Sequence, residues 1–339
     1  MRFSAHPFFL RTSRHTAHLA LMAPLLAPLA LALAGPSAAQ TPYPSKPIRM
    51  IVGFPGGGIT DVISRAVANQ LTQVLGQSVF IENKPGAGTT IAADLVAKSA
   101  PDGYTLMLTD VTTHAINASL YPNLPYDTVT SFTPVGMVAS TPLMLVVNSN
   151  SPVKSVQELI VQQKAKPGFY GSSGNGTIIH LAAAMLSSAG KIEPSHVPYK
   201  GSAPATQALL AGEIDFFFSS LPPALAQVKA GKLRALAVTT PQRVPSAPDV
   251  PTMGEAGIPR FEVVLYNGIV GPAGLPAPVV KTLNDALAKV LASPEIKTAY
   301  LQLGADVVST ATPAQFNQIV AREMTTYGPI VKATGAKIE

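Results

Sequence analysis

The chain alternates short apolar segments with helix-like segments, and the joints between them are rich in glycine. Residues 48–52 predict a buried strand, which is followed by a glycine loop at 54–59 and then by a helix. The same unit of strand, glycine loop and helix recurs at 78–99 and at 169–188. Strands that alternate with helices in this way indicate an α/β protein rather than an all-α or an all-β fold.

These units form two series, and the chain passes twice between them. Strand-like crossings fall at about 141–145 and 261–268. We therefore expect two α/β lobes joined by two crossing strands, with a ligand in the cleft between them. The predicted first lobe is discontinuous, 40–142 plus 264–339, and the second lobe is 143–263.

The N-terminal segment predicts export. Arg2, Arg11 and Arg14 precede an apolar run at 19–34, which is shorter than the roughly 20 residues that span a membrane. We expect a cleaved signal peptide at 1–39 and a periplasmic mature protein. Removal of the signal peptide would lower the formal net charge from +6 to +3. No cluster of Lys and Arg in the sequence suggests a nucleic-acid partner. The absence of cysteine excludes disulfides and thiolate metal sites.

The glycine loops predict an anion site. A loop of this kind lets the backbone approach a ligand, and the helix that follows it offers unpaired N–H groups. Neither phosphate motif is present, since Thr177 stands where a P-loop has lysine and the loop at 86–91 lacks a third glycine. Lys200 is the one plausible cation near the expected cleft. A carboxylate would therefore need about five neutral donors. Alternatively, each glycine loop is only a tight connection.

The residues do not indicate a catalytic site or a metal site. The loop around Ser173 does not match Gly-x-Ser-x-Gly, because Asn175 replaces the second glycine. His114, His180 and His196 lack metal-ligand spacing. We therefore predict no catalytic residue, no metal and no cofactor, and we hold an exported hydrolase only as a disfavoured alternative.

Three polar residues have two interpretations each. His180 either supports the neighbouring glycine loop, which we favour, or contacts the ligand. Asp61 is either a helix cap, which we favour, or a carboxylate base. Asp215 lies in an apolar strand and either orients a loop or meets a cationic group of the ligand.

Seven short motifs occur in a fixed order, and together they carry a family resemblance. The chain resembles the Bug-type receptors of tripartite tricarboxylate transporters over essentially all of 44–339. The motifs are 54–61, 82–88, 101–106, 124–127, 170–174, 196–201 and 231–238.

The resemblance implies a type II-like periplasmic binding protein, not an enzyme, that closes two lobes on a small organic carboxylate. It implies delivery to a membrane permease by a monomeric receptor; a sensor partner of an exported signalling domain is the alternative. The implied ligand-binding residues are Phe54, Gly56, Gly57, Gly58, Asp61, Gly86, Ala87 and Gly88 in the first lobe, and Ser172, Ser173, Gly174, Thr177, His180, Tyr199, Gly201, Ala203 and Asp215 in the second.

Four residues depart from the family pattern. Thr89 and Thr90 replace the usual Gly-Gly or Gly-Asn, Ala184 replaces a usual Glu, and Tyr266 replaces a usual Trp. These departures bear on the identity of the ligand more than on the fold.

Overall fold

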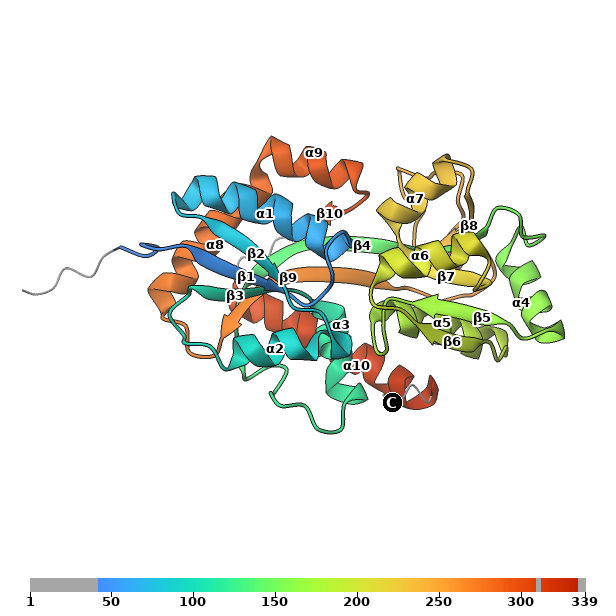
Figure 1. Ribbon diagram of the computed structural model, residues 1–339, viewed down its shortest axis with the longest axis horizontal. Coiled ribbons are helices and arrows are strands. Elements are labelled where there is room, and N and C mark those ends of the chain that lie inside the picture. The colour runs from blue at the N-terminus through green and yellow to red at the C-terminus, as the bar shows by residue number, and fades with distance from the viewer. Residues whose placement is uncertain (1–41, 309–311, 335–339) are drawn as a thin grey trace, which may run out of the picture. The chain divides into compact units, whose positions relative to one another are not determined.

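The computed structural model of the chain describes residues 42–308 and 312–334 (Figure 1). Residues from Tyr43 onward pack as one unit. The predicted signal peptide at 1–39 lies outside the described residues.

The described strands join into one hydrogen-bonded sheet. Its order is β2-β1-β3-β9-β4-β7-β5-β6, and β8 and β10 pair with β4 outside this path. The strands are β1 Ile48–Val52, β2 Val79–Asn83, β3 Thr105–Asp110, β4 Phe132–Asn148, β5 Phe169–Ser172, β6 Ser195–Pro198, β7 Phe216–Ser220, β8 Leu233–Val238, β9 Val264–Pro272 and β10 Asp306–Val307.

The helices cover both faces of this sheet (Figure 1). They are α1 Ile59–Leu75, α2 Thr90–Ala97, α3 Val111–Leu120, α4 Val156–Ala165, α5 Ile178–Gly190, α6 Ser202–Ala211, α7 Leu221–Lys229, α8 Ala277–Ala292, α9 Pro294–Gln302 and α10 Pro313–Thr334, and Ala87–Thr89 form a 3₁₀ turn, η1.

Strand β4 divides the sheet into two halves. It pairs with β9 from Phe132 to Pro142 and with β7 and β8 beyond Leu143. We call β1, β2, β3, β9, β10 and the start of β4, with the helices packed on them, the first half. The second half is the end of β4 with β5–β8 and α4–α7. Strand β4 crosses from the first half into the second, and β9 lies beside its first part (Figure 1).

The strand directions aim both halves at their junction. Strands β1, β2 and β3 are mutually parallel. Both β3 and β4 are antiparallel to β9, so β1, β2 and β3 point in the same direction as β4. Strands β5, β6 and β7 are mutually parallel and run against β4. The carboxyl ends of the two parallel sets therefore face each other, and this is where α/β sheets bind ligands.

Local sequence explains individual elements. The Ser155 hydroxyl accepts a hydrogen bond from the amide of Glu158, and the Glu158 carboxylate accepts one from the amide of Lys154, a reciprocal cap that begins α4. The aromatic run at 216–218 is fully buried on β7 and forms part of the core. Helix α3, the short strand β10 and the first part of β4 at 132–142 were not predicted. Their β-branched and mixed residues give no clean helical or alternating period.

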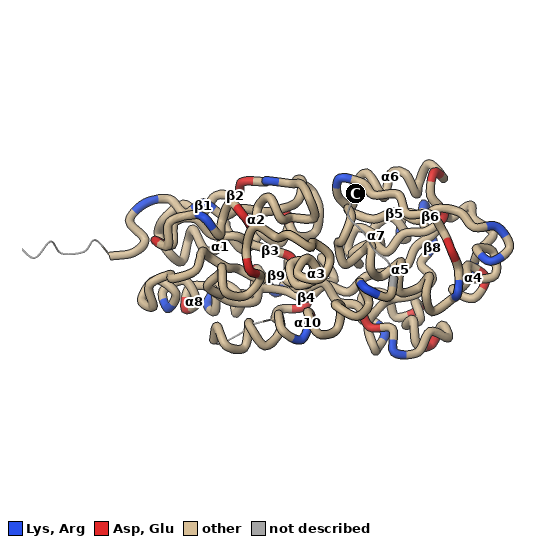
Figure 2. Tube along the Cα trace, turned by 90° about the horizontal axis from the view of Figure 1, so that it is seen from below, with Lys and Arg blue, Asp and Glu red and all other residues tan. Residues whose placement is uncertain are grey.

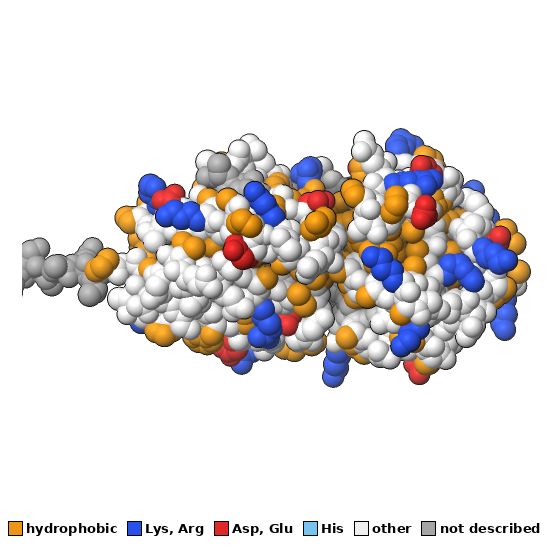
Figure 3. All heavy atoms as spheres, turned by 90° about the horizontal axis from the view of Figure 1, so that it is seen from above, with side chains coloured by type: hydrophobic (Ala, Val, Ile, Leu, Met, Phe, Trp, Pro, Cys, Tyr) orange, Lys and Arg blue, Asp and Glu red, His pale blue; other side chains and the backbone are white. Residues whose placement is uncertain are grey.

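Charged side chains are dispersed along the described chain (Figure 2). On the face shown in Figure 3, lysine and arginine are interspersed with acidic and apolar side chains. That face has no basic patch of the kind that binds nucleic acid.

Candidate functional site

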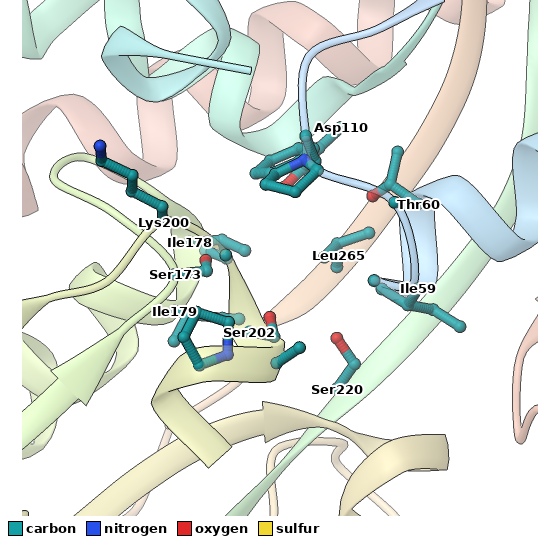
Figure 4. Close-up of a pocket in the computed structure, with 17 residues that line it drawn as sticks. Ile59, Thr60, Asp110, Ser173, Ile178, Ile179, Lys200, Ser202, Ser220 and Leu265 are labelled. Atoms are coloured by element: carbon teal, nitrogen blue, oxygen red, sulfur yellow. The ribbon is translucent and has the colours of Figure 1, made fainter. Parts of the chain in front are cut away.

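Two adjoining cavities lie at the junction of the halves. The larger, about 410 Å³, is lined by the loops after β1, β2, β5 and β6. The smaller, about 100 Å³, is lined by the start of α1, the ends of β3 and β7, and the starts of α5 and α6 (Figure 4). The two cavities share the lining residues Phe54, Pro55, Ser173, Lys200 and Gly201.

Most of the predicted ligand-binding residues line these cavities. Those that do are Phe54, Gly56, Gly58, Gly86, Ala87, Gly88, Ser173, Gly174, Thr177, Tyr199, Gly201 and Ala203. Gly57, Asp61, Ser172, His180 and Asp215 are not lining residues.

The first half presents free backbone donors. Within the described residues, the amides of Gly56, Gly58, Gly86, Ala87 and Gly88 have no intramolecular hydrogen-bond partner. All five belong to residues that line a cavity. Several N–H groups that converge at strand ends and helix starts create a site for a negatively charged group.

The second half uses its glycine amides internally. The amide of Gly174 donates to the Ser172 hydroxyl, that of Gly176 to Nδ1 of His180, and that of Gly201 to the Ser173 carbonyl. The Ser173 and Thr177 hydroxyls are also engaged, donating to Thr177 Oγ1 and to the Gly174 carbonyl. Among the other lining residues of this half, the amides of Ser173, Lys200, Ser202 and Ala203 have no hydrogen-bond partner within the described residues.

Asp61 organises the first loop from behind. Its carboxylate accepts hydrogen bonds from the Gly57 amide at 2.9 Å, from the Arg65 guanidinium and from the Asn83 side chain. Burial alone would raise the pKa of Asp61, but the hydrogen bonds from Arg65, Asn83 and Gly57 bring that pKa below its ordinary value. Asn83 also donates to the carbonyl of Phe54, so the ends of β1 and β2 are tied together.

His180 supports the loop after β5, which is the interpretation that the sequence favoured. Its ring stacks on His196 with centroids 3.9 Å apart, and His196 Nε2 lies 2.7 Å from the Ser172 hydroxyl. Burial lowers the pKa of His180 to about 4; burial and the neighbouring His180 lower the pKa of His196 to about 3. Both rings are therefore neutral at pH 7, and Ser172 is fully buried behind the loop.

Asp215 lies away from both cavities. It immediately precedes β7, and its carboxylate accepts a hydrogen bond from the amide of Phe169 at 2.7 Å, at the start of β5. Since β5 and β7 are parallel, this is the end opposite to the one that faces the junction. Of its two interpretations, the structure supports loop orientation.

Among the cavity-lining residues that the sequence analysis did not name as site residues are Asp110, Ser220 and Thr89. Asp110 is the last residue of β3, and Ser220 is the last residue of β7. Once α3 is found, the strand order alone predicts that both residues lie at the junction. Thr89 has a positive φ of 78°, an outlier for a β-branched residue, and its buried hydroxyl has no partner among the described residues.

The two halves touch around the cavities. The Ile178 amide at the start of α5 donates to the Thr113 hydroxyl of α3 at 3.3 Å. A Cβ built on Gly88 would lie 3.1 Å from the Asn175 carbonyl oxygen, so the loops after β2 and β5 are in close approach. Ligands enclosed this way lose contact with bulk water.

Two further observations narrow the class of protein. Among the described residues, no cluster of three or more histidine and acidic side chains could hold a metal ion. The described helices include none with the length and apolar character needed to cross a membrane. Two α/β halves whose strand ends enclose a pair of amide-lined cavities have the architecture of a solute-binding protein.

Comparisons with known proteins identify the family. The model of the tripartite tricarboxylate transporter family receptor matches residues 63–336. The protein BugT of Bordetella pertussis is 38% identical over 310 residues, which cover 91% of this chain and 94% of BugT. The solved structure of the periplasmic binding protein BugD is 35% identical with a TM-score of 0.83, covering 88% of this chain and all of that one. A solved R. palustris protein with adipate is 34% identical with a TM-score of 0.83, covering 87% of this chain and all of that one.

The chain therefore belongs to the tripartite tricarboxylate transporter receptor family, in its Bug-type branch. The predicted resemblance and the periplasmic-binding-protein fold are confirmed. The family and its neighbours are solute-binding receptors rather than enzymes, as the sequence analysis expected.

Proposed function

We propose that this receptor works in the periplasm, where it captures a small organic carboxylate and delivers it to the membrane permease of a tripartite transporter. The observation that carries the proposal is the group of five partnerless amides in the loops after β1 and β2, all belonging to residues that line one pair of cavities. A hydrogen bond to a charged group contributes roughly 1.5–3 kcal/mol, so this number of donors suits a carboxylate at micromolar affinity. The adipate in the R. palustris relative supports the same chemistry.

Capture would proceed by closure of two lobes, 40–142 plus 264–339 against 143–263. The change of partners along β4 between Pro142 and Leu143 supports this boundary. The contact between Ile178 and Thr113 would then belong to the closed form. Strand β4, which continues from one lobe into the other, and the segment that enters β9 at Val264 are suitable hinges.

The experiment for binding is calorimetry on protein that has been unfolded, stripped of ligand and refolded. A panel of mono-, di- and tricarboxylates is titrated, with neutral amides of the same acids as matched controls. We expect at least one carboxylate to bind at micromolar affinity and its amide not to bind. A well-folded sample that gives neither heat nor a thermal shift with any carboxylate would refute the proposal.

Closure is measured separately by the distance between two spin labels. The chain has no cysteine, so Ile91→Cys in α2 and Val161→Cys in α4 give one exposed label site in each half. We expect ligand to shorten and narrow the distance distribution. A permease partner is tested by ligand-dependent capture of the membrane components from the native host. Capture of a sensor protein in their place would favour the alternative.

A further inference from the structure

The smaller cavity differs in chemistry from the larger one. The amides of Gly56 and Gly58 lie at its lining, but its side-chain walls are mostly apolar and come from both halves: Ile59, Ile178, Ile179, Pro204 and Leu265. Its volume of about 100 Å³ is far larger than the roughly 10–15 Å³ that a single water needs. A ligand whose carboxylate meets the loop amides would place the rest of its body here, because the two cavities adjoin.

The buried charged side chain that lines the smaller cavity is an acid. Asp110 is 1% exposed, caps α3, and accepts hydrogen bonds from the amide and the hydroxyl of Thr113. The one cation among the residues lining this cavity is Lys200, which is exposed and also lines the larger cavity. A second ligand carboxylate would therefore be placed beside a buried negative charge in a region of low dielectric constant, which is unfavourable.

Ser220 supplies an unsatisfied hydroxyl on the other side of the cavity (Figure 4). It is 1% exposed, and its Oγ has no hydrogen-bond partner in the described part of the chain. The cause is local. Ser220 is the N-cap of α7, and the next positions that such a hydroxyl would cap are Pro222 and Pro223, which have no N–H. The hydroxyl is left to point into the cavity.

We infer that the ligand is a monocarboxylate with an apolar body and a hydrogen-bond donor at its far end, which Asp110 and Ser220 recognise. The inference rests on the proposed carboxylate-binding function and names its ligand class. The donor is a hydroxyl or an ammonium group, since both present hydrogen to an acid. Dicarboxylates of the same length are discriminated against by Asp110.

The test is a calorimetric ranking on the full mature chain, stripped of ligand. For each length from four to eight carbons, the titrants are the unsubstituted acid, the ω-hydroxy acid, the ω-amino acid and the dicarboxylate. At the best length we expect a donor-bearing acid to bind at least about tenfold more tightly than the dicarboxylate, a difference of about 1.4 kcal/mol. Comparison of the ω-hydroxy acid with the ω-amino acid of the same length shows which donor is preferred.

Variants assign the effect to residues. Asp110→Asn keeps the size and the helix-capping oxygen but removes the charge, so the dicarboxylate should gain about tenfold. Ser220→Ala should weaken the donor-bearing acid several-fold and leave the unsubstituted acid unchanged. Asp127→Asn is the matched control, because Asp127 also accepts turn amides but does not line either cavity, and it should leave the ranking unchanged.

The outcomes separate the two proposals. If a dicarboxylate binds the wild-type protein more tightly than its hydroxy and amino counterparts, the inference is wrong while the carboxylate receptor stands. The same holds if a folded Asp110→Asn protein keeps the wild-type ranking. If no carboxylate of any kind binds, both fail. Should Asp110→Asn not fold, the wild-type ranking and Ser220→Ala still decide.

Discussion

The glycine loops of the two halves look alike in sequence but do different work. In the first half, the loops after β1 and β2 keep five amides without an intramolecular partner. In the second half, the glycine amides of the loops after β5 and β6 are bonded to Ser172, His180 and the Ser173 carbonyl, and the amides left without a partner belong to residues with side chains, such as Ser173 and Ser202. Glycine content therefore indicates where a backbone can approach a ligand, whereas the polar residues behind each loop decide whether its N–H groups remain available.

The largest expected effect follows from crowding the loop after β2. Gly88 has φ +58°, and an added Cβ would lie 2.9 Å from the Tyr121 hydroxyl and 3.1 Å from the Asn175 carbonyl. Gly88→Ala should displace the loop and misplace at least two donors, lowering affinity by roughly 100-fold or more in calorimetry.

Gly76→Ala is the matched control for this substitution. Gly76 ends α1 with φ +67° and has no atom near the added Cβ, so it carries the backbone strain without the collision. Each variant should lose about 1–2 kcal/mol of unfolding free energy from the left-handed backbone. Equal affinities in both variants would show that the loop after β2 does not hold the ligand.

Removing the support behind the first loop should have the next largest effect. Asp61→Ala deprives the Gly57 amide, Arg65 and Asn83 of their acceptor. We expect about tenfold weaker binding and a loss of roughly 1–3 kcal/mol in denaturant unfolding. Asp285→Ala is the control, because it breaks a comparable i,i+4 pair, with Lys281, on the exposed face of α8. If Asp61→Ala binds as the wild type does, the first loop holds its shape without this carboxylate.

Acid should affect the loop after β5 before it affects the loop after β1. The pKa of His180 is lowered to about 4 and that of His196 to about 3, so between pH 6.5 and 4 the unfolded state binds more protons than the folded state. The stability that these rings provide is present above about pH 6.5 and is lost as pH falls toward their folded pKa values. The pKa of Asp61 lies below its ordinary value of 3.8, so the support of the first loop persists until lower pH.

Hydrogen exchange measures this difference directly. After incubation at pH 4.5 and a labelling pulse at a common pH, peptides covering 172–180 should exchange faster, while peptides covering 53–61 should not. His180→Phe keeps a ring against His196 and removes the titrating group, so it should reduce the acid effect. Simultaneous loosening of both segments would mean that the two loops do not open independently.

Much of this arrangement was predictable from the sequence. The alternation of strands and glycine loops gave the α/β class, and the spacing of the motifs led to the loops that line the cavities. What escaped was the set of internal partners. Whether the Gly174 amide is free depends on the Ser172 hydroxyl, and the positions of Asp110 and Ser220 depend on how separate strands pair. Those are long-range facts that local patterns do not encode.

Substitution of Thr89 should have the smallest effect of these changes. It tests whether a side chain of the first half adds to the binding provided by the backbone amides. Its φ of 78° strains a β-branched residue, and its orphan hydroxyl lines the larger cavity beside the free amides. Thr89→Gly relieves about 1–2 kcal/mol of strain but adds backbone entropy to the unfolded chain, so the net stabilisation should be within about 1 kcal/mol. Binding should weaken about threefold, because the hydroxyl is one donor among several. Unchanged or tighter binding in calorimetry would show that the backbone amides of the first half are sufficient and that the strain at Thr89 has no part in recognition.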